Sequence, residues 1–448
     1  MDIKELKQRC LEEIDKNKDK IIEAGRKIYT TPELGYKEVQ STKTASDFLK
    51  SLGVDVTENI AVTGCMTSLN KEKNGPKIAV MGELDSVMCP EHKDSNEIGN
   101  MHCCGHNIQV AGMLGCALGI INSGALEHLS GKIDFMAVPA EECIDLEFRK
   151  TLQDKNEIKF IGGKQELLNR GYFDDVDMSM MFHALNFEDN KNCVVKSYTN
   201  GFISKAVTLI GKSSHAGISP HLGVNAYTMS TLVTNNINAQ RDTFKDEDKV
   251  RISSIINHGG DVVNVVPSKV TMEFMVRAAT VEAMMDANEK VNRSINAAAL
   301  ALGGKAIVED TIGFLPLDSD NTMDAIFKRN FVELMGGDDS TITDVIITAG
   351  STDFGDISQL MPCVHPWIGG VSGALHTSDY ELSDEELAYI IPAKAMAMTV
   401  IDLLWDDAKV AKDIVENFKP QFTKEEYLSF MDENTNTHTF DYIKKYHN

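Results

Sequence analysis

The order of apolar segments along the chain constrains its fold most strongly. Short apolar runs of strand length alternate with longer stretches in which apolar residues recur at helical spacing. The strand-like runs are 77–81, 132–138 and 176–182, and the helix-like stretches include 42–52 and 110–121. Strands that alternate with helices are typical of an α/β domain. The alternation returns at 340–348 and 384–405, so we predict that two separate segments of the chain build one α/β domain.

The segment between these two parts follows a different order. It reads as strand, helix, strand, strand, helix and strand, at 204–211, 223–239, 250–258, 270–278, 281–302 and 305–310. This order is typical of a split β-α-β, or ferredoxin-like, unit. We therefore predict an α+β domain at 193–314, inserted into a catalytic domain formed by 1–192 and 315–448. The charged, Asn- and Thr-rich tail after Asp406 is assigned no function.

The net charge and the cysteines limit the classes of function. Lys and Arg minus Asp and Glu give 44 − 67 = −23, a balance that opposes binding to nucleic acid or to anionic membranes. The most apolar stretches are too short to span a bilayer (108–121) or are interrupted by Pro392, Lys394 and Asp402 (387–405). The first residues lack the apolar core of a secretory signal. With nine cysteines that show no framework spacing, we expect reduced thiols and a cytoplasmic enzyme.

The densest cluster of potential metal ligands lies at 101–107. It contains Cys104 and His106, and alternate residues of an extended segment point to the same side, so one metal ion could bind both. Buried free cysteines and hydrogen-bonded histidines are also common, and the cluster alone does not decide between these interpretations.

Two adjacent carboxylates, Glu141 and Glu142, follow the apolar run 133–138. Adjacent acids repel each other, and their position at a strand end is explained if a cation holds one of them while the other carries a proton. A solvated pair in a loop is the alternative. His183 and His376 also lie at predicted strand ends or loops, although each histidine alone is more typical of a structural residue.

Taken together, Cys104, His106, Glu142, His183 and His376 have the ligand types that suit zinc or a similar first-row metal. Five ligands and a bridging water can serve two ions about 3.5–4 Å apart, as in two-metal hydrolases.

Six motifs occur in an order that resembles a known family. They are Pro-Glu-Leu-Gly-Tyr-Lys-Glu at 32–38, Gly-Glu-Leu-Asp at 82–85, Cys-Gly-His-Asn at 104–107, Ala-Glu-Glu at 140–142, Ser-His-Ala-Gly at 214–217 with Asn-Ala at 225–226, and Leu-His at 375–376. The chain resembles the aminoacylase/carboxypeptidase G metallopeptidase family, most closely its amidohydrolase branch. That branch includes the plant auxin-conjugate hydrolases and bacterial p-aminobenzoyl-glutamate hydrolase. The resemblance extends from about residue 22 to 403.

The resemblance implies a zinc-peptidase-like α/β catalytic domain with an inserted dimerisation domain, in a homodimer. It implies two divalent ions per subunit, zinc or manganese with cobalt as a further possibility, held by the five residues named above. Glu141 becomes the general base, His215 reaches the site from the neighbouring subunit, and Asn264 and Arg277 bind substrate. The Glu-Leu-Asp at 83–85 departs from the His-x-Asp of other branches, which leaves open whether Asp85 contacts metal.

The function implied is hydrolysis of the amide bond of N-acyl-amino acids, aminobenzoyl-glutamate-like conjugates or small dipeptides that carry a free carboxylate. The alternative is a non-catalytic or co-catalytic partner subunit of a related heteromeric enzyme.

Overall fold

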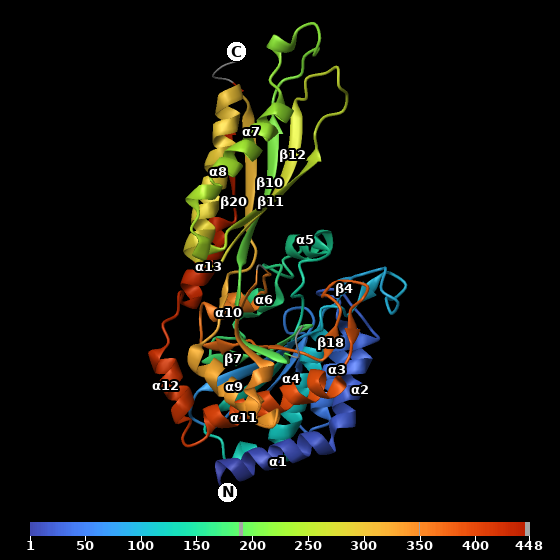
Figure 1. Ribbon diagram of the computed structural model, residues 1–448, viewed down its shortest axis with the longest axis vertical. Coiled ribbons are helices and arrows are strands. Elements are labelled where there is room, and N and C mark those ends of the chain that lie inside the picture. Colours follow the sequence, from blue (N-terminus) through green and yellow to red (C-terminus); the bar gives the residue numbers. More distant parts are fainter. Residues whose placement is uncertain (188–190, 349, 444–448) are drawn as a thin grey trace. The chain divides into compact units, whose positions relative to one another are not determined.

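The computed structural model describes residues 1–187, 191–348 and 350–443, and the chain divides into two compact units (Figure 1). Unit 1 comprises Met1–Tyr198, Asp318–Ile347 and Asp356–Gln421. Unit 2 comprises Thr199–Leu317, Thr348–Gly355 and Phe422–Asn448.

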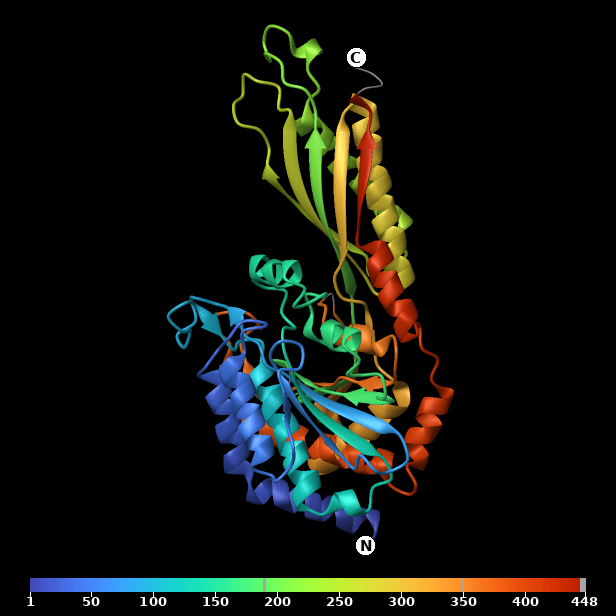
Figure 2. The same cartoon turned by 180° about the vertical axis from the view of Figure 1, so that it is seen from behind.

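A six-stranded sheet with the order β1-β2-β6-β3-β7-β16 forms the centre of unit 1 (Figure 2). Its strands are β1 (Thr57–Glu58), β2 (Cys65–Leu69), β3 (Lys77–Glu83), β6 (Lys132–Val138), β7 (Met178–Met180) and β16 (Cys363–Val364). The strands β3, β6, β7 and β16 are parallel, whereas β2 pairs antiparallel with β6. All seven residues of β3 are buried, as expected for a parallel strand covered on both faces. The carboxyl ends of β3 and β6 therefore meet at one edge of the sheet.

Helix α4 (His106–Asn122) is the central helix of unit 1. Its residues are apolar on every side and are buried from His106 to Ile120, as in a helix enclosed by protein. It packs against β3, α1 (Ile3–Lys16), α2 (Lys18–Tyr29) and α11 (Ile391–Leu404). The stretch Glu386–Leu404, a π-helical turn followed by α11, is long and apolar enough to cross a membrane, but 83% of its apolar window is buried within the protein. It is a core helix of this fold.

The remaining elements of unit 1 surround this core. The helices are α3 (Val39–Lys50), α5 (Leu146–Asp154), α6 (Gly163–Asn169), α9 (Asn321–Leu334), α10 (Phe354–Ser358) and α12 (Lys409–Asn417), with 3₁₀ turns at Ala125–Glu127 and Asp339–Thr341. A second sheet contains β14 (Leu317–Asp318), β9 (Cys193–Thr199), β17 (Trp367–Ile368), β8 (His183–Ala184) and β15 (Ile342–Thr348). Two short pairs are β4 (Val87–Met88) with β5 (Asn100–Met101), and β18 (Val371–Ser372) with β19 (Glu381–Leu382).

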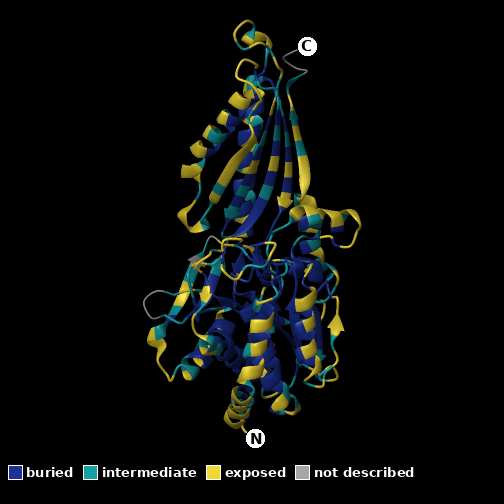
Figure 3. Cartoon of the chain, turned by 90° about the vertical axis from the view of Figure 1, so that its right-hand side faces the viewer, coloured by how far each residue is buried: buried dark blue, intermediate teal, exposed yellow. Residues whose placement is uncertain are grey.

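Unit 2 is an antiparallel sheet with helices packed against it. The strand order is β11-β12-β10-β13-β20, with β10 (Gly201–Ile210), β11 (Arg251–His258), β12 (Lys269–Ala278), β13 (Lys305–Ile312) and β20 (Asn436–Asp441). The helices are α7 (Ala226–Ala239), α8 (Val281–Leu302) and α13 (Lys424–Asn434), with 3₁₀ turns at Pro220–Leu222, Arg241–Thr243 and Asp246–Asp248. Buried residues alternate with less buried ones along β12 (Figure 3), the pattern of a sheet with one face against the core. That face packs on α7 and α8.

The C-terminal segment differs from the predicted division, which assigned all of 315–448 to the catalytic domain. Strand β20 pairs antiparallel with β13, from Lys305 opposite Asp441 to Asp310 opposite Asn436, and Figure 2 shows the red β20 beside β13. An unpaired β13 would expose a row of backbone N–H and C=O groups, and β20 covers that edge. Residues 422–448 therefore belong to unit 2.

Candidate metal centre

The site in unit 1 is built from loops that follow the central strands. Glu141 and Glu142 come shortly after β6, His183 begins β8, and Cys104 lies two residues before the first residue of α4. Gly105 is the N-cap of α4 with a φ of +87°, and a Cβ at this position would lie 2.8 Å from the Cβ of Ala184. Glycine is therefore required here both by the backbone and by the close approach of β8.

The structure brings together the five side chains that the sequence selects as ligands. The Sγ atom of Cys104 lies 3.4 Å from Nε2 of His183, and Nε2 of His376 lies 3.0 Å from Oε1 of Glu142. The potential ligand atoms form three sets, and within each set the atoms lie within 4.8 Å of one another. The sets are Cys104 with His106 and His183, Cys104 with Glu142 and His376, and Glu83 with His106 and Glu141. The first two sets share Cys104, so one thiolate could serve two ions.

His106 directs its Nε2 atom towards the other potential ligands. Its Nδ1 atom lies 2.9 Å from the backbone oxygen of Asp85 and 3.1 Å from Oδ1 of the same residue. Because both neighbours are acceptors, Nδ1 carries a proton, and Nε2 is left to bind a cation. Nε2 of His106 and Oε1 of Glu142 are buried, and each faces an ionisable group, Oε2 of Glu83 at 3.1 Å and Nε2 of His376 at 3.0 Å, although neither atom makes a hydrogen bond among the described residues. Burial lowers the pKa of His106, but the charges of Cys104 and Glu83 outweigh it and raise the pKa well above its ordinary value, so a cation at Nε2 would displace a proton.

The spacing of the ligand atoms also suits a metal ion. For zinc, bonds of about 2.3 Å to sulfur and about 2.0–2.1 Å to nitrogen in tetrahedral geometry place the two ligand atoms about 3.5 Å apart. The 3.4 Å between Cys104 and His183 is close to this value. The donor set therefore fits a divalent first-row metal.

Burial and neighbouring charges shift the protonation of these groups. Burial lowers the pKa of His183 to about 4, so this imidazole is neutral near pH 7, the form that binds metal. Burial raises the pKa of the Cys104 thiol well above its ordinary value, and the charge of Glu142 raises it further. For Glu142, burial opposes ionisation, but contact with His376 outweighs it and lowers the pKa of the carboxyl. A thiol with a raised pKa must lose its proton when a cation binds.

Asp85 holds two residues of the site in place. One carboxylate oxygen faces Nδ1 of His106, and the other accepts the backbone N–H of Glu142 at 2.9 Å. This arrangement orients one proposed ligand and the backbone of another, as supporting carboxylates do in metal sites. The sequence carried a signal for it, because Glu83 and Asp85 are two positions apart after a buried strand.

Glu83 was not selected from the sequence, although its Oε2 atom lies 3.1 Å from Nε2 of His106. The carboxylate is buried and accepts hydrogen bonds from Lys164 Nζ and from Gln109 Nε2 at 2.8 Å. Burial raises the pKa of Glu83, but the charge of Lys164 outweighs it, so the pKa lies below its usual range. Trp367 also lies at this site, with its ring 4.6 Å from that of His183.

The other three predicted site residues, His215, Asn264 and Arg277, belong to unit 2. Nδ1 of His215 accepts the backbone N–H groups of Gly217 and Ile218 at 3.2 and 3.1 Å. The backbone oxygen of Asn264 accepts the N–H of Ala216 at 3.0 Å, which joins the two loops. Arg277 lies on β12 and donates from Nη1 to Ser351 at 3.2 Å.

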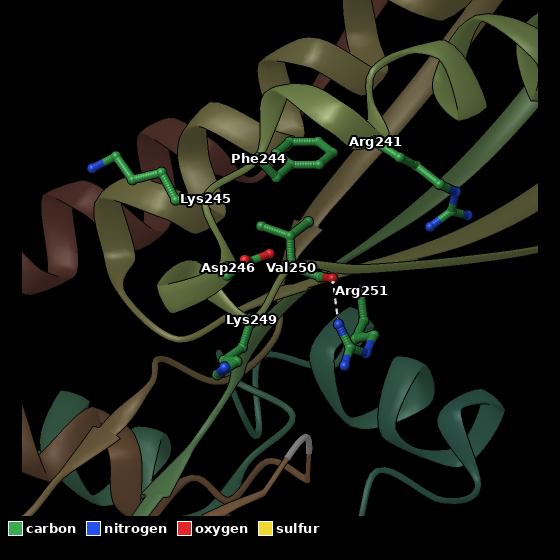
Figure 4. Close-up of a pocket in the computed structure, with 7 residues that line it drawn as sticks. All are labelled: Arg241, Phe244, Lys245, Asp246, Lys249, Val250 and Arg251. Carbon is green, nitrogen blue, oxygen red and sulfur yellow. Dashed lines mark hydrogen bonds between the residues drawn. The ribbon is translucent and has the colours of Figure 1, made fainter.

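Unit 2 also contains a hollow of about 490 Å³ (Figure 4). It is lined by Arg241, Phe244, Lys245, Asp246, Lys249, Val250 and Arg251. Arg241 and Lys245 point to opposite sides in Figure 4, and none of the predicted site residues lines this hollow. We therefore base the functional argument on the ligand cluster of unit 1.

Comparisons with known proteins bear on the family and the fold. Residues 198–302 match the peptidase dimerisation domain of the M20 family. The chain is 27% identical to mouse Xaa-Arg dipeptidase over 440 residues, which cover 95% of this chain and 94% of the relative. It is 22% identical to hippurate hydrolase of Campylobacter jejuni, over 81% of this chain and 91% of the relative.

A solved structure supports the fold. The dinuclear metal-binding M20 peptidase of Bacillus subtilis superposes with a TM-score of 0.68 at 20% identity, and the match covers 86% of this chain and 98% of that one. This likeness confirms the predicted fold class, an α/β catalytic domain with an inserted α+β dimerisation domain.

Proposed function

We propose that this chain is a metal-dependent amide hydrolase of the M20 type, and that it releases an amino acid from an amide by cleaving the bond to the amino acid nitrogen. The substrates are N-acyl-amino acids, aminobenzoyl-glutamate-like conjugates or small dipeptides with a free carboxylate. The observation that carries this proposal is the pair of ligand sets that share Cys104, with Glu141 beside His106.

We assign five residues as ligands of two divalent ions, zinc or manganese: Cys104, His106, Glu142, His183 and His376. Ions held there would lower the pKa of a water molecule to about 7 and polarise the amide carbonyl. The buried Nε2 of His106 and Oε1 of Glu142, which make ion-pair contacts but no hydrogen bond among the described residues, support this assignment. The mixture of sulfur, nitrogen and oxygen donors supports it as well.

Glu141 moves the proton. Its side chain is largely buried, and its Oε2 atom lies 4.0 Å from Nε2 of His106. Glu141 takes a proton from the attacking water as the oxygen bonds to the amide carbon, and it gives that proton to the departing nitrogen when the carbon–nitrogen bond breaks. The products are a carboxylic acid and a free amino acid, and Glu141 returns to its starting state.

Residues of unit 2 complete the proposed site. Nδ1 of His215 accepts two backbone N–H groups, so the neutral ring carries its proton on Nε2. That N–H can donate to the negative charge that develops on the amide oxygen. We propose that His215 comes from the partner subunit of a homodimer, which the dimerisation domain supports. Asn264 and Arg277 hold the substrate carboxylate, since a guanidinium can bind it through two hydrogen bonds.

The names of the relatives narrow the substrates to be tested. Xaa-Arg dipeptidase and hippurate hydrolase are both named for amides that contain an amino acid with a free carboxylate. The net charge of −23 attracts cationic molecules, so dipeptides that end in arginine are a useful first group. The nine cysteines, which show no framework spacing, support a reducing location, and we propose the cytoplasm.

The test is a screen of the purified protein with added zinc or manganese. The panel contains N-acyl-amino acids, aminobenzoyl-glutamate and dipeptides with arginine or glutamate at the C-terminus, and released amino acid is measured. Each substrate is paired with the same compound whose carboxylate is blocked as an amide, and Glu141→Gln serves as the control protein. Release from the free acids alone supports the proposal. Release from none of them contradicts it and favours a subunit that needs a partner protein.

A further inference from the structure

The Pro32–Glu38 motif ends in a carboxylate that the proposed mechanism does not use. Glu38 is completely buried. It occupies the N-cap position of α3, but its side chain does not cap that helix. Instead, its Oε2 atom accepts the hydroxyl of Thr63 at 2.5 Å, and its Oε1 atom accepts the backbone N–H of Ala140 at 2.8 Å. The motif thus reaches the residue directly before Glu141.

Ala140 has an unusual backbone conformation. Its φ is +58°, in the left-handed region, where a Cβ crowds the following carbonyl oxygen and only glycine is comfortable. A residue persists in this conformation only when its surroundings hold it there. Without such support, Ala140 would relax to a negative φ and carry Glu141 and Glu142 with it.

The contacts around Ala140 supply this support. Its carbonyl oxygen accepts the N–H of Gly163 at 3.1 Å and a guanidinium N–H of Arg149 at 3.4 Å. Gly35 of the same motif packs so closely that a Cβ there would lie 2.9 Å from the Cα of Ala140. The backbone N–H of Ala140 donates to Oε1 of Glu38. Loss of Glu38 would therefore leave a buried N–H without its partner.

We propose that Glu38 is a positioning residue, whose side-chain carboxyl oxygen holds Ala140 in the left-handed conformation and thereby aims Glu141 and Glu142 at the metal centre. The proposal rests on the proposed function, in which these two residues are the base and a ligand. Asp85 accepts the N–H of Glu142 at 2.9 Å. The turn at 140–142 therefore donates two alternate backbone N–H groups to two buried carboxyl groups, those of Glu38 and Asp85.

A purely structural role explains Glu38 less well. Burial and the charge of Asp85 together raise the pKa of this carboxyl to about 8, so the surroundings of Glu38 oppose its ionisation. An apolar side chain would fill the same space without this penalty, but it could not accept the N–H of Ala140. The hydrogen bond to the turn is therefore the feature that requires a polar residue.

The experiment compares four variants with the wild type: Glu38→Gln, Glu38→Ala, Ala140→Gly and the double variant Glu38→Ala/Ala140→Gly. Glutamine keeps an oxygen for the N–H of Ala140, whereas alanine does not. Glycine adopts positive φ without the crowding that a Cβ causes, so Ala140→Gly lowers the need for the hydrogen bond. Thr63→Val is the matched control, because it removes the other hydrogen bond of the same carboxylate and leaves the turn alone.

We expect Glu38→Ala to lower kcat about 100-fold, the scale of a 1 Å misplacement at an active site, with KM within about threefold of the wild type. Glu38→Gln, Ala140→Gly and Thr63→Val should each keep kcat within about threefold. The kcat of the double variant should be about tenfold higher than that of Glu38→Ala. Absence of recovery in the double variant, or an equal loss of kcat in Glu38→Gln and Glu38→Ala, would overturn the proposal.

Cobalt-substituted protein gives a readout that needs no substrate. The visible absorption of bound Co²⁺ should change in Glu38→Ala and return towards the wild-type spectrum in the double variant. If the wild type cleaves no amide, the proposed function fails while these spectra still test the role of Glu38. Identical spectra in the wild type and Glu38→Ala would contradict that role.

Discussion

Substitution of Cys104 by serine is expected to remove metal from both ion positions. Cys104 belongs to two of the three ligand sets, whereas His183 and His376 each belong to one. Binding of structural zinc by four ligands contributes about 10–16 kcal/mol, or roughly 2.5–4 kcal/mol per ligand if the energy is divided equally. Since about 1.4 kcal/mol corresponds to a tenfold change in Kd, loss of one ligand should weaken the binding of each ion by about 10²–10³-fold.

The neighbouring Cys103 offers a matched control. It is completely buried, but it occurs in none of the ligand sets found among the described residues. Burial and the nearby Cys89 together raise the pKa of its thiol to about 12. A Cys103→Ser variant therefore tests the loss of a buried thiol next to the site without the loss of a ligand.

Metal content after dialysis and competition with a chromophoric chelator measure this effect. We expect the wild type and Cys103→Ser to retain metal with similar Kd values, and Cys104→Ser to lose it. If Cys104→Ser keeps both ions with unchanged Kd, or if Cys103→Ser loses as much metal, Cys104 is not a shared ligand and the assignment of the site is wrong.

Three further predictions concern other residues. Glu141→Gln should retain metal and lose about 10²–10⁴-fold in turnover, whereas Glu142→Gln should also lose metal; near-normal turnover of Glu141→Gln would exclude it as the base. If His215 acts across the dimer, mixing inactive His215→Ala with inactive Glu141→Gln under conditions of subunit exchange should restore part of the activity, because one site of each mixed dimer is intact. If the mixture stays inactive although mass spectrometry shows mixed dimers, His215 acts within its own chain. The folded-state pKa of Glu38, about 8, lies above its ordinary value of 4.5, so its contribution to stability is present below pH 4.5 and is lost as the pH rises through 8. The wild type should therefore lose stability relative to Glu38→Gln between pH 5 and 8 in urea unfolding, and a constant difference over this range would contradict the buried, ionising carboxyl.

Much of the architecture could be predicted because it depends on local patterns. The apolar run 132–138 coincides with β6, and the predicted helix at 281–302 coincides with α8. Hydrophobic periodicity records which face of an element is buried, and this information lies within a few neighbouring residues. The strand at the C-terminus was missed because its six residues, Asn436–Asp441, are mostly polar and become a strand only by pairing with the edge of β13.

The sequence by itself determined which residues could do chemistry, since Cys104, His106 and the Glu141–Glu142 pair occur in recognisable local motifs. Tertiary structure alone decided which side chains support them. Glu38 and Ala140 are separated by 102 positions, Lys164 and Glu83 by 81, and His106 and Asp85 by 21. Contacts of this kind depend on how the strands and helices pack, and no local pattern of charge or hydrophobicity encodes the distance between two atoms so far apart along the chain.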